Sequence, residues 1–192
     1  METWIPMAAG VFIALLIYRL YVRVIKTRNA TLTALASVDV QLKKRRDLIG
    51  NVLAIAKETM RQETALIERV TALRQQAAAD PDVGDPTSVA EHLKAENALG
   101  SGMQRLFVQA EAYPEAQFVA AMTRAQATYE EVEGHIAAAR RFYNQGVEDL
   151  RNVAEIFPSS VIARLLGVRA LPYFEIADEE RAPVDAAQFF ES

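Results

Sequence analysis

A seven-residue apolar repeat in the first half of the chain limits most strongly what the chain can fold into. Apolar residues recur along two stripes, at every seventh position from residue 35 to 77 and from residue 38 to 73, with Arg45 and Glu63 as charged interruptions. Such a repeat is typical of long helices that pack lengthwise against other helices. We therefore predict one helix over residues 29–78, about 75 Å long at a rise of 1.5 Å per residue.

The composition agrees with long helices and excludes several classes of site. Ala, Leu, Glu and Arg are abundant, whereas only 8 Gly and 7 Pro are scattered through 192 residues. That usage favours helices over sheets. The chain has no cysteine, which excludes disulfides, thiolate metal sites and cysteine nucleophiles. A net charge of −4 gives no reason to expect nucleic acid as a partner.

The N-terminal stretch resembles a membrane anchor. No charged residue lies between Thr3 and Tyr18, and the apolar character continues to residue 25 around two arginines. About 20 residues are needed to cross the bilayer core, and the long arginine stems reach back to the headgroups. We predict a single-pass helix with a basic flank over residues 1–27. Its predicted interface residues are Trp4, Tyr18, Arg19, Tyr21, Arg23, Lys26 and Arg28.

Two alternatives to an anchor are an interfacial or core helix and a cleavable signal peptide. A signal peptide has a basic start and small residues at its cleavage site. Here Glu2 precedes the apolar stretch and bulky residues 18–21 follow it, so we favour an uncleaved anchor. The basic residues all follow the span, which predicts a cell-membrane protein with its N-terminus outside and residues 28–192 in the cytoplasm.

The rest of the chain predicts two more long helices, one short helix and an irregular tail. Residues 80–86 read as a loop, and Ser88 with Glu91 reads as a capping box that starts the second helix. The pair Tyr113-Pro114 predicts a turn, although a kink within one helix over residues 88–157 is the alternative.

The third long helix has the most regular pattern in the chain. Its apolar residues alternate in spacing between four and three from Phe118 to Phe157. Pro158 is expected to end this helix, and Gly167 to end the short helix that follows.

Several segments follow one another in an order that is specific in combination. They are residues 42–49 (LKKRRDLI) with Arg46 and Asp47, Asn51 and Glu63, Tyr113-Pro114, Glu133 and Ile136, Tyr143-Asn144, Phe157-Pro158, and Tyr173-Phe174-Glu175 with Arg181 and Pro183. In this order the segments resemble the LemA family, and the resemblance spans roughly residues 29–190. Where the family pattern leads us to expect proline, this chain has Gly50.

The resemblance implies an N-terminally anchored, up-and-down helical bundle of undefined molecular role. With the pattern analysis it predicts an all-α fold: a transmembrane helix, then three long helices and one short one, then an irregular C-terminal tail. The domains are then the anchor and basic flank (residues 1–27), the LemA-like bundle (residues 28–167) and a tail packed on the bundle (residues 168–192).

No arrangement of residues points to catalysis. His92 and His135 are poorly placed to chelate a metal ion together with their neighbours, and we expect both at the surface. The acidic loop at residues 80–86 lacks the pattern of a calcium loop. We therefore expect no enzyme activity, no metal and no cofactor.

Four polar residues fall on apolar stripes and form a predicted polar layer: Arg45, Glu63, Tyr129 and Tyr143. A buried polar layer fixes the register of helices, because misaligned packing would leave a charge without a partner. The alternative is a site for a ligand or a partner protein. We favour the structural interpretation.

The functional prediction is a membrane-anchored, non-catalytic scaffold or adaptor. The alternative is a lipid-associated protein that remodels the membrane surface and self-assembles. The predicted second helix covers only half of the first, which leaves Leu35, Val38, Leu42 and Ile49 without a partner. An exposed apolar seam predicts a homo-oligomer. The expected partners are the lipid bilayer, further copies of the chain and other membrane proteins.

Overall fold

A computed structural model describes residues 4–175 of the chain, so the predicted tail residues Arg181 and Pro183 lie outside the described part. Within this part, every regular element is helical. The elements are α1 (Trp4–Thr59), the short 3-10 helix η1 (Arg61–Glu63), α2 (Thr64–Ala77), α3 (Pro86–Ala110), α4 (Ala116–Glu155) and α5 (Ser159–Leu165).

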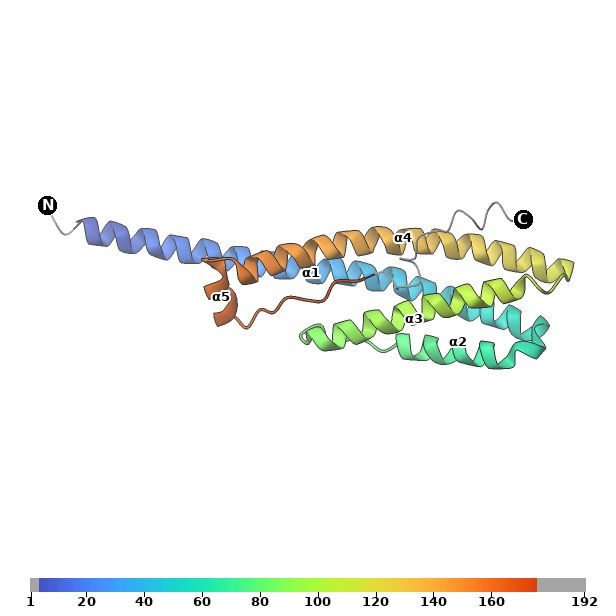
Figure 1. Cartoon of the computed structure of the whole chain (residues 1–192). Coiled ribbons are helices and arrows are strands. Elements are labelled where there is room, and N and C mark those ends of the chain that lie inside the picture. The colour runs from blue at the N-terminus through green and yellow to red at the C-terminus, as the bar shows by residue number, and fades with distance from the viewer. Residues whose placement is uncertain (1–3, 176–192) are drawn as a thin grey trace, which may run out of the picture.

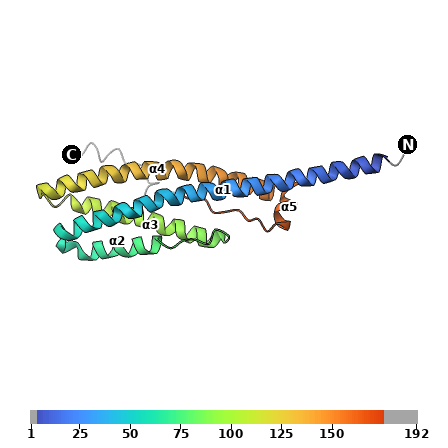
Figure 2. The same cartoon turned by 180° about the vertical axis from the view of Figure 1, so that it is seen from behind.

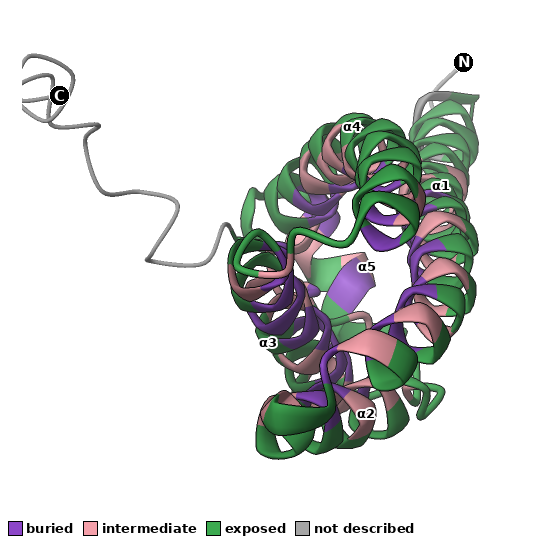
Figure 3. Cartoon of the chain, turned by 90° about the vertical axis from the view of Figure 1, so that its right-hand side faces the viewer, coloured by how far each residue is buried: buried purple, intermediate pink, exposed green. Residues whose placement is uncertain are grey.

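The long helices run up and down along one axis. Figures 1 and 2 show α4 returning along α1, while the shorter pair α2 and α3 packs beside the half of the rod farthest from the N-terminus. Seen along the axis, α1, α2, α3 and α4 surround a core whose buried surfaces face inward (Figure 3). The prediction of an all-α, up-and-down bundle is confirmed.

The prediction of a single helix over residues 29–78 is wrong. The first helix continues the N-terminal apolar segment without a break but ends at Thr59, and α2 folds back from it. No Gly or Pro marks this turn. Its cause is tertiary packing, because α2 buries Ile67 and Val70 in the core that α3 completes. In one straight helix, those side chains would have no partner.

The predicted exposed seam on α1 is covered. Leu35, Val38, Leu42 and Ile49 are all buried, because the chain turns at residues 111–115 and α4 then returns along α1. The turn at Tyr113-Pro114 is therefore confirmed. The comparison of the first two predicted helices left out α4, which returns along α1. The difference in their lengths therefore gives no reason to expect self-association.

Two details of α3 follow from its sequence. The helix starts three residues earlier than the capping-box prediction, with Asp85 as N-cap accepting a hydrogen bond from the amide of Thr87 and Pro86 in the first turn. The glycines in its middle do not interrupt it. A Cβ on Gly102 would lie 3.0 Å from Leu73 Cδ1, so this glycine allows α2 and α3 to pack closely.

The short helix α5 ends as the sequence predicts. Gly167 has a φ of 65°, in the left-handed region that glycine adopts easily. The amide of Val168 donates to Ala163 O at 2.9 Å and that of Gly167 to Arg164 O at 3.1 Å, the pair of bonds of a Schellman motif.

Residues 168–175, which we call the tail strap, then run back along the bundle (Figure 1). Leu171 and Phe174 of the strap are buried among core residues of α1, α3 and α4. The Tyr143 hydroxyl donates to Pro172 O at 2.7 Å, and the Asn144 side chain makes two hydrogen bonds to the backbone of Phe174. The strap therefore completes the core.

The helices α1 and α4 approach each other closely at Gly146. The Thr31 hydroxyl donates to Gly146 O at 2.8 Å, and a Cβ on Gly146 would lie 3.3 Å from the Thr31 Cα atom. That contact is with backbone, so a local side-chain movement cannot relieve it. Gly134 lies on the same helix with open space around it.

The two glycines make a matched pair for measuring this contact. Gly134→Ala should raise the free energy of unfolding by about 0.5–1 kcal/mol, because alanine is the better helix former. Gly146→Ala should be less stable than Gly134→Ala by about 1–3 kcal/mol, because the added methyl group overpacks the helix contact. Urea unfolding of the full chain in detergent, followed by circular dichroism, measures both. Equal stabilities of the two variants would contradict the close packing.

Candidate functional site

The most unusual side chain of the bundle is the buried Arg45 of α1. Its Nη2 atom donates to both the side chain and the backbone carbonyl of Glu96 on α3, each at 2.7 Å. Its Nη1 atom donates to Glu133 Oε1 on α4 at 3.0 Å. One guanidinium group thus joins three helices.

A second arginine completes the group. Arg46 Nη1 pairs with the other carboxylate oxygen of Glu96, whose side chain is fully buried. We call Arg45, Arg46, Glu96 and Glu133 the ion cluster. Two positive and two negative groups balance formally, which lowers the cost of burying them.

The ion cluster lies between two apolar parts of the core. Ile49, Leu99 and Met103 belong to the part farther from the N-terminus. Leu42 and Leu93 belong to the nearer part. A bundle shifted by one helical turn would bring charges against apolar side chains, so the ion cluster is suited to fixing the register of α1, α3 and α4.

The electrostatics of the cluster favour its charged form. Burial lowers the pKa of Arg45, but Tyr129, Glu133 and Glu96 outweigh this effect and hold the pKa above its ordinary value. Burial raises the pKa of the nearby Tyr129 phenol well above its usual range. Arg45 is therefore a fixed cation and Tyr129 a neutral phenol at physiological pH.

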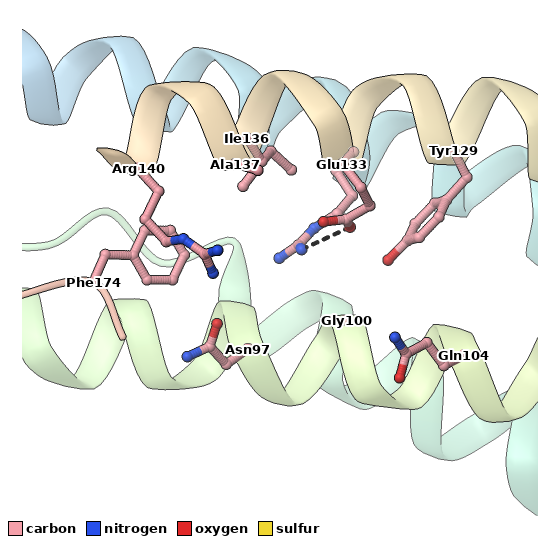
Figure 4. A pocket seen from close by; sticks show the side chains of 10 residues that line it. Asn97, Gly100, Gln104, Tyr129, Glu133, Ile136, Ala137, Arg140 and Phe174 are labelled. Atoms are coloured by element: carbon pink, nitrogen blue, oxygen red, sulfur yellow. Dashed lines mark hydrogen bonds and ion pairs between the residues drawn. The ribbon is translucent and has the colours of Figure 1, made fainter. Parts of the chain in front are cut away.

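A cavity of about 220 Å³ opens beside the cluster. Arg45, Tyr129 and Glu133 line one part of it, and Arg140 with Phe174 of the tail strap lines another (Figure 4). Among the described residues, the Tyr129 hydroxyl and Arg45 Nε have no hydrogen-bond partner. Both atoms are buried from solvent, although their residues line the cavity.

The predicted polar layer is only partly assembled. Arg45 and Tyr129 lie together at the cavity. Glu63 lies instead in the turn between α1 and α2, where it accepts a hydrogen bond from Gln109 at 2.9 Å. Tyr143 is buried against the tail strap. The two charged residues that interrupt the repeat therefore differ: Arg45 is a buried ion within α1, whereas Glu63 lies in the turn between α1 and α2.

Sequence reasoning missed the acidic members of the ion cluster. Glu96 falls on the apolar face of α3 between Leu93 and Leu99, the same signal that identified Arg45. Glu133 follows Tyr129 by four residues, which puts the two on one helix face. Both carboxylates could thus have been found as partners for Arg45.

The residues that carry the family resemblance are spread over the bundle. Arg46 belongs to the ion cluster, and Asn144 holds the tail strap. Two others lie on the surface, where Asp47 pairs with Lys43 and Asn51 is exposed. Tyr113 and Pro114 form the turn before α4, and the ring of Tyr113 packs edge-on against Phe118. Phe157 and Pro158 form the exposed turn before α5.

The predicted membrane-interface residues lie on the surface of α1. Trp4, Tyr18, Arg19, Tyr21, Arg23, Lys26 and Arg28 are all exposed. Within α1 there is a stretch long and apolar enough to cross a membrane, and nearly all of it is exposed. Tyr18, Arg19, Arg23 and Lys26 line one shallow groove, as expected for residues on one helix face.

The prediction that His92 lies at the surface is wrong. His92 is buried on α3, its Nδ1 atom lies 3.0 Å from Ala79 O, and its Nε2 atom lies 3.5 Å from Asp39 Oδ1 on α1. It faces inward because it shares the inward face of α3 with Val89 and Glu96. His135 is exposed, as predicted. Within residues 4–175, no group of three or more histidine or acidic residues is placed to hold a metal ion.

Breaking the ion cluster should be strongly destabilising. Glu96→Ala leaves Arg45 buried without its main partner, so we expect the free energy of unfolding to fall by about 3–5 kcal/mol. Urea unfolding measures it. The double variant Arg45→Met with Glu96→Leu should recover most of the loss, because apolar residues of similar size often replace a buried ion pair without penalty.

The surface pair of Lys43 and Asp47 gives the control. Its atoms lie 2.9 Å apart, but both side chains are more than half exposed, so Asp47→Ala should leave the unfolding midpoint almost unchanged. If Glu96→Ala unfolds no more easily than Asp47→Ala, the ion cluster does not stabilise the bundle.

The His92 pair predicts a pH dependence of stability. The Asp39 carboxylate, 3.5 Å from His92 Nε2, favours the protonated imidazole and raises the pKa of His92 above its ordinary value of 6.5, and Glu96 acts in the same direction. The pair therefore stabilises the fold fully below that ordinary value, and the contribution is lost as the pH rises through the folded-state pKa. The stability difference between the unmodified chain and His92→Gln should shrink over this range. His135→Gln, on the exposed face of α4, should keep the profile of the unmodified chain. Parallel profiles for all three proteins would contradict the pairing.

Comparison with known proteins agrees with the family resemblance. The sequence model of the LemA family matches residues 34–189, which include the ion cluster, the cavity and the tail strap. No curated protein matches the chain. The match covers most of the sequence, and the chain belongs to the LemA family.

Proposed function

We propose that the chain is a membrane-anchored helical scaffold without catalytic activity. The observation that carries the proposal is the continuity of α1. One helix of 56 residues contains the exposed apolar stretch and then becomes a core helix of the bundle. A bundle joined to its anchor without a flexible linker is suited to holding a binding surface at a set height above a bilayer.

The ion cluster supports a structural role over a catalytic one. Its charges are paired with each other across three helices, and Arg45 is held in its charged form. A general acid or base works best with a pKa near the operating pH. Neither Arg45 nor Tyr129 has such a value. We therefore assign the cavity beside them to the packing of the core.

The charges of α1 support one orientation. Arg19, Arg23, Lys26 and Arg28 follow the apolar stretch. Basic residues next to a membrane span favour the cytoplasmic side. The N-terminus is then outside the cell membrane and the bundle is in the cytoplasm, where other membrane proteins are the expected partners.

A second candidate function is association with lipids at the membrane surface. It is favoured by the groove that Arg19, Arg23 and Lys26 share with Tyr18 on one face of α1. Clustered basic side chains next to a membrane span attract anionic headgroups. This function is compatible with the same anchor and the same orientation.

Protease protection in intact cells tests the orientation. With an epitope at the C-terminus, protease added to intact cells or spheroplasts should leave the bundle and the epitope whole, and lysis should expose them.

Alkaline carbonate should not extract the full chain from membranes, whereas a variant starting at residue 28 should be released. Degradation of the epitope in intact cells would contradict the orientation, and extraction of the full chain would contradict the anchor.

A further inference from the structure

The turn from α4 to α5, together with α5 itself, exposes a group of large apolar side chains. Ile156, Phe157, Val161, Leu165 and Leu166 are from 40% to 79% exposed, with Phe157 and Leu165 at the upper limit. Over the rest of the described bundle, exposed large apolar residues such as Val40 and Phe142 are dispersed. We call the five side chains the α5 patch. A contiguous exposed apolar patch marks an interaction surface.

The level of the α5 patch along α1 coincides with the expected membrane surface. Ala163 of α5 packs with Val24 of α1 and Val153 of α4. A span of about 20 residues that begins at Trp4 ends at Arg23. Val24 is therefore the first residue beyond the apolar core of a bilayer, and it is fully buried.

The direction of α5 also suits a membrane surface. The helix lies across the direction of α1 and α4 in Figures 1 and 2, at the end of the bundle from which the anchor emerges. A helix that crosses a membrane-normal helix lies roughly in the membrane plane. This is how amphipathic helices lie at the boundary between headgroups and acyl chains.

Charged residues around the patch fit anionic headgroups. Arg164 lies within α5 and Arg169 follows it, and both are exposed. Arg23 and Lys26 of α1 are exposed on either side of Val24. Glu155, at the end of α4, precedes the patch in the chain and adds an acidic residue. Apolar side chains with basic neighbours are typical of segments that bind anionic membrane surfaces.

We propose that the α5 patch is a second membrane contact, which inserts Phe157 and Leu165 into the bilayer interface beside the anchor. This inference rests on the proposed anchor and goes beyond it, because an anchor alone leaves the bundle free to stand clear of the membrane. In a bilayer of given thickness, the two contacts together set the tilt of the bundle and its rotation about α1.

Fluorescence quenching by brominated lipids tests the proposal on the full chain. The chain has one tryptophan, Trp4, which reports on the anchor. In vesicles of phosphatidylcholine and phosphatidylglycerol with brominated acyl chains, Trp4 should be quenched. Three further variants carry Trp4→Phe together with Phe157→Trp, Leu165→Trp or Phe142→Trp.

Phe142 is the matched control, because it is an exposed phenylalanine of α4 at 65% exposure. It precedes the end of α4 at Glu155 by 13 residues, which is about 20 Å along the helix axis. Tryptophan at positions 157 and 165 should lose emission in brominated vesicles and be shielded from iodide in the water. Tryptophan at position 142 should keep its emission in brominated vesicles and be quenched by iodide.

Each outcome separates the two proposals. If Trp4 is quenched but positions 157 and 165 behave like position 142, the anchor stands and the second contact is wrong. Shielding from iodide without quenching by brominated lipid would also overturn the second contact, and would assign the patch to a protein partner. If Trp4 itself escapes quenching, the anchor fails and the inference that rests on it fails as well.

Discussion

The pairing of Arg45 with two carboxylates is the interaction on which the register of the bundle depends. Arg45 comes from α1, Glu96 from α3 and Glu133 from α4, so the ion cluster ties together helices that are far apart in the chain. Apolar contacts alone allow helices to slide by a turn at modest cost, since one leucine replaces another. A buried guanidinium does not allow such a shift, because moving Arg45 by a turn separates its charge from both Glu96 and Glu133. The apolar cores on either side provide most of the stability, and the ion cluster determines which helical turns meet.

The half of the rod nearer the N-terminus is closed by different means. The described structure has α2 and α3 beside only the far half of α1 and α4, so the near half needs other cover (Figure 1). The tail strap supplies it through Leu171 and Phe174, held by Tyr143 and Asn144. Arg140 and Arg151 lie over the rings of Phe174 and Tyr173. The segment after the last helix is therefore part of the core, and the bundle is complete only once the strap has folded onto it.

The sequence predicted helices better than it predicted where they turn. The spacing from Phe118 onward identified α4 correctly, because a face buried along its whole length leaves a continuous pattern. The turn after Thr59 left no such sign, because only the later pairing of α2 with α3 makes it favourable. At the site, Arg45 was visible as a charge on an apolar stripe. Glu96 and His92 also fall on an apolar face, that of α3, and were overlooked. Single polar residues are tolerated on many helices, and a buried one is recognised only when its partner across the core is known.

The continuity of α1 has a mechanical consequence in a chain anchored as proposed. From Val24 to Thr59 the helix rises about 54 Å at 1.5 Å per residue. Transmembrane helices tilt by about 20° on average, to an extent that depends on bilayer thickness. A tilt of that size moves the far tip sideways by about 18 Å. The stiff helix then acts as a lever, converting a small change in lipid thickness at its foot into a large displacement of the turn between α1 and α2.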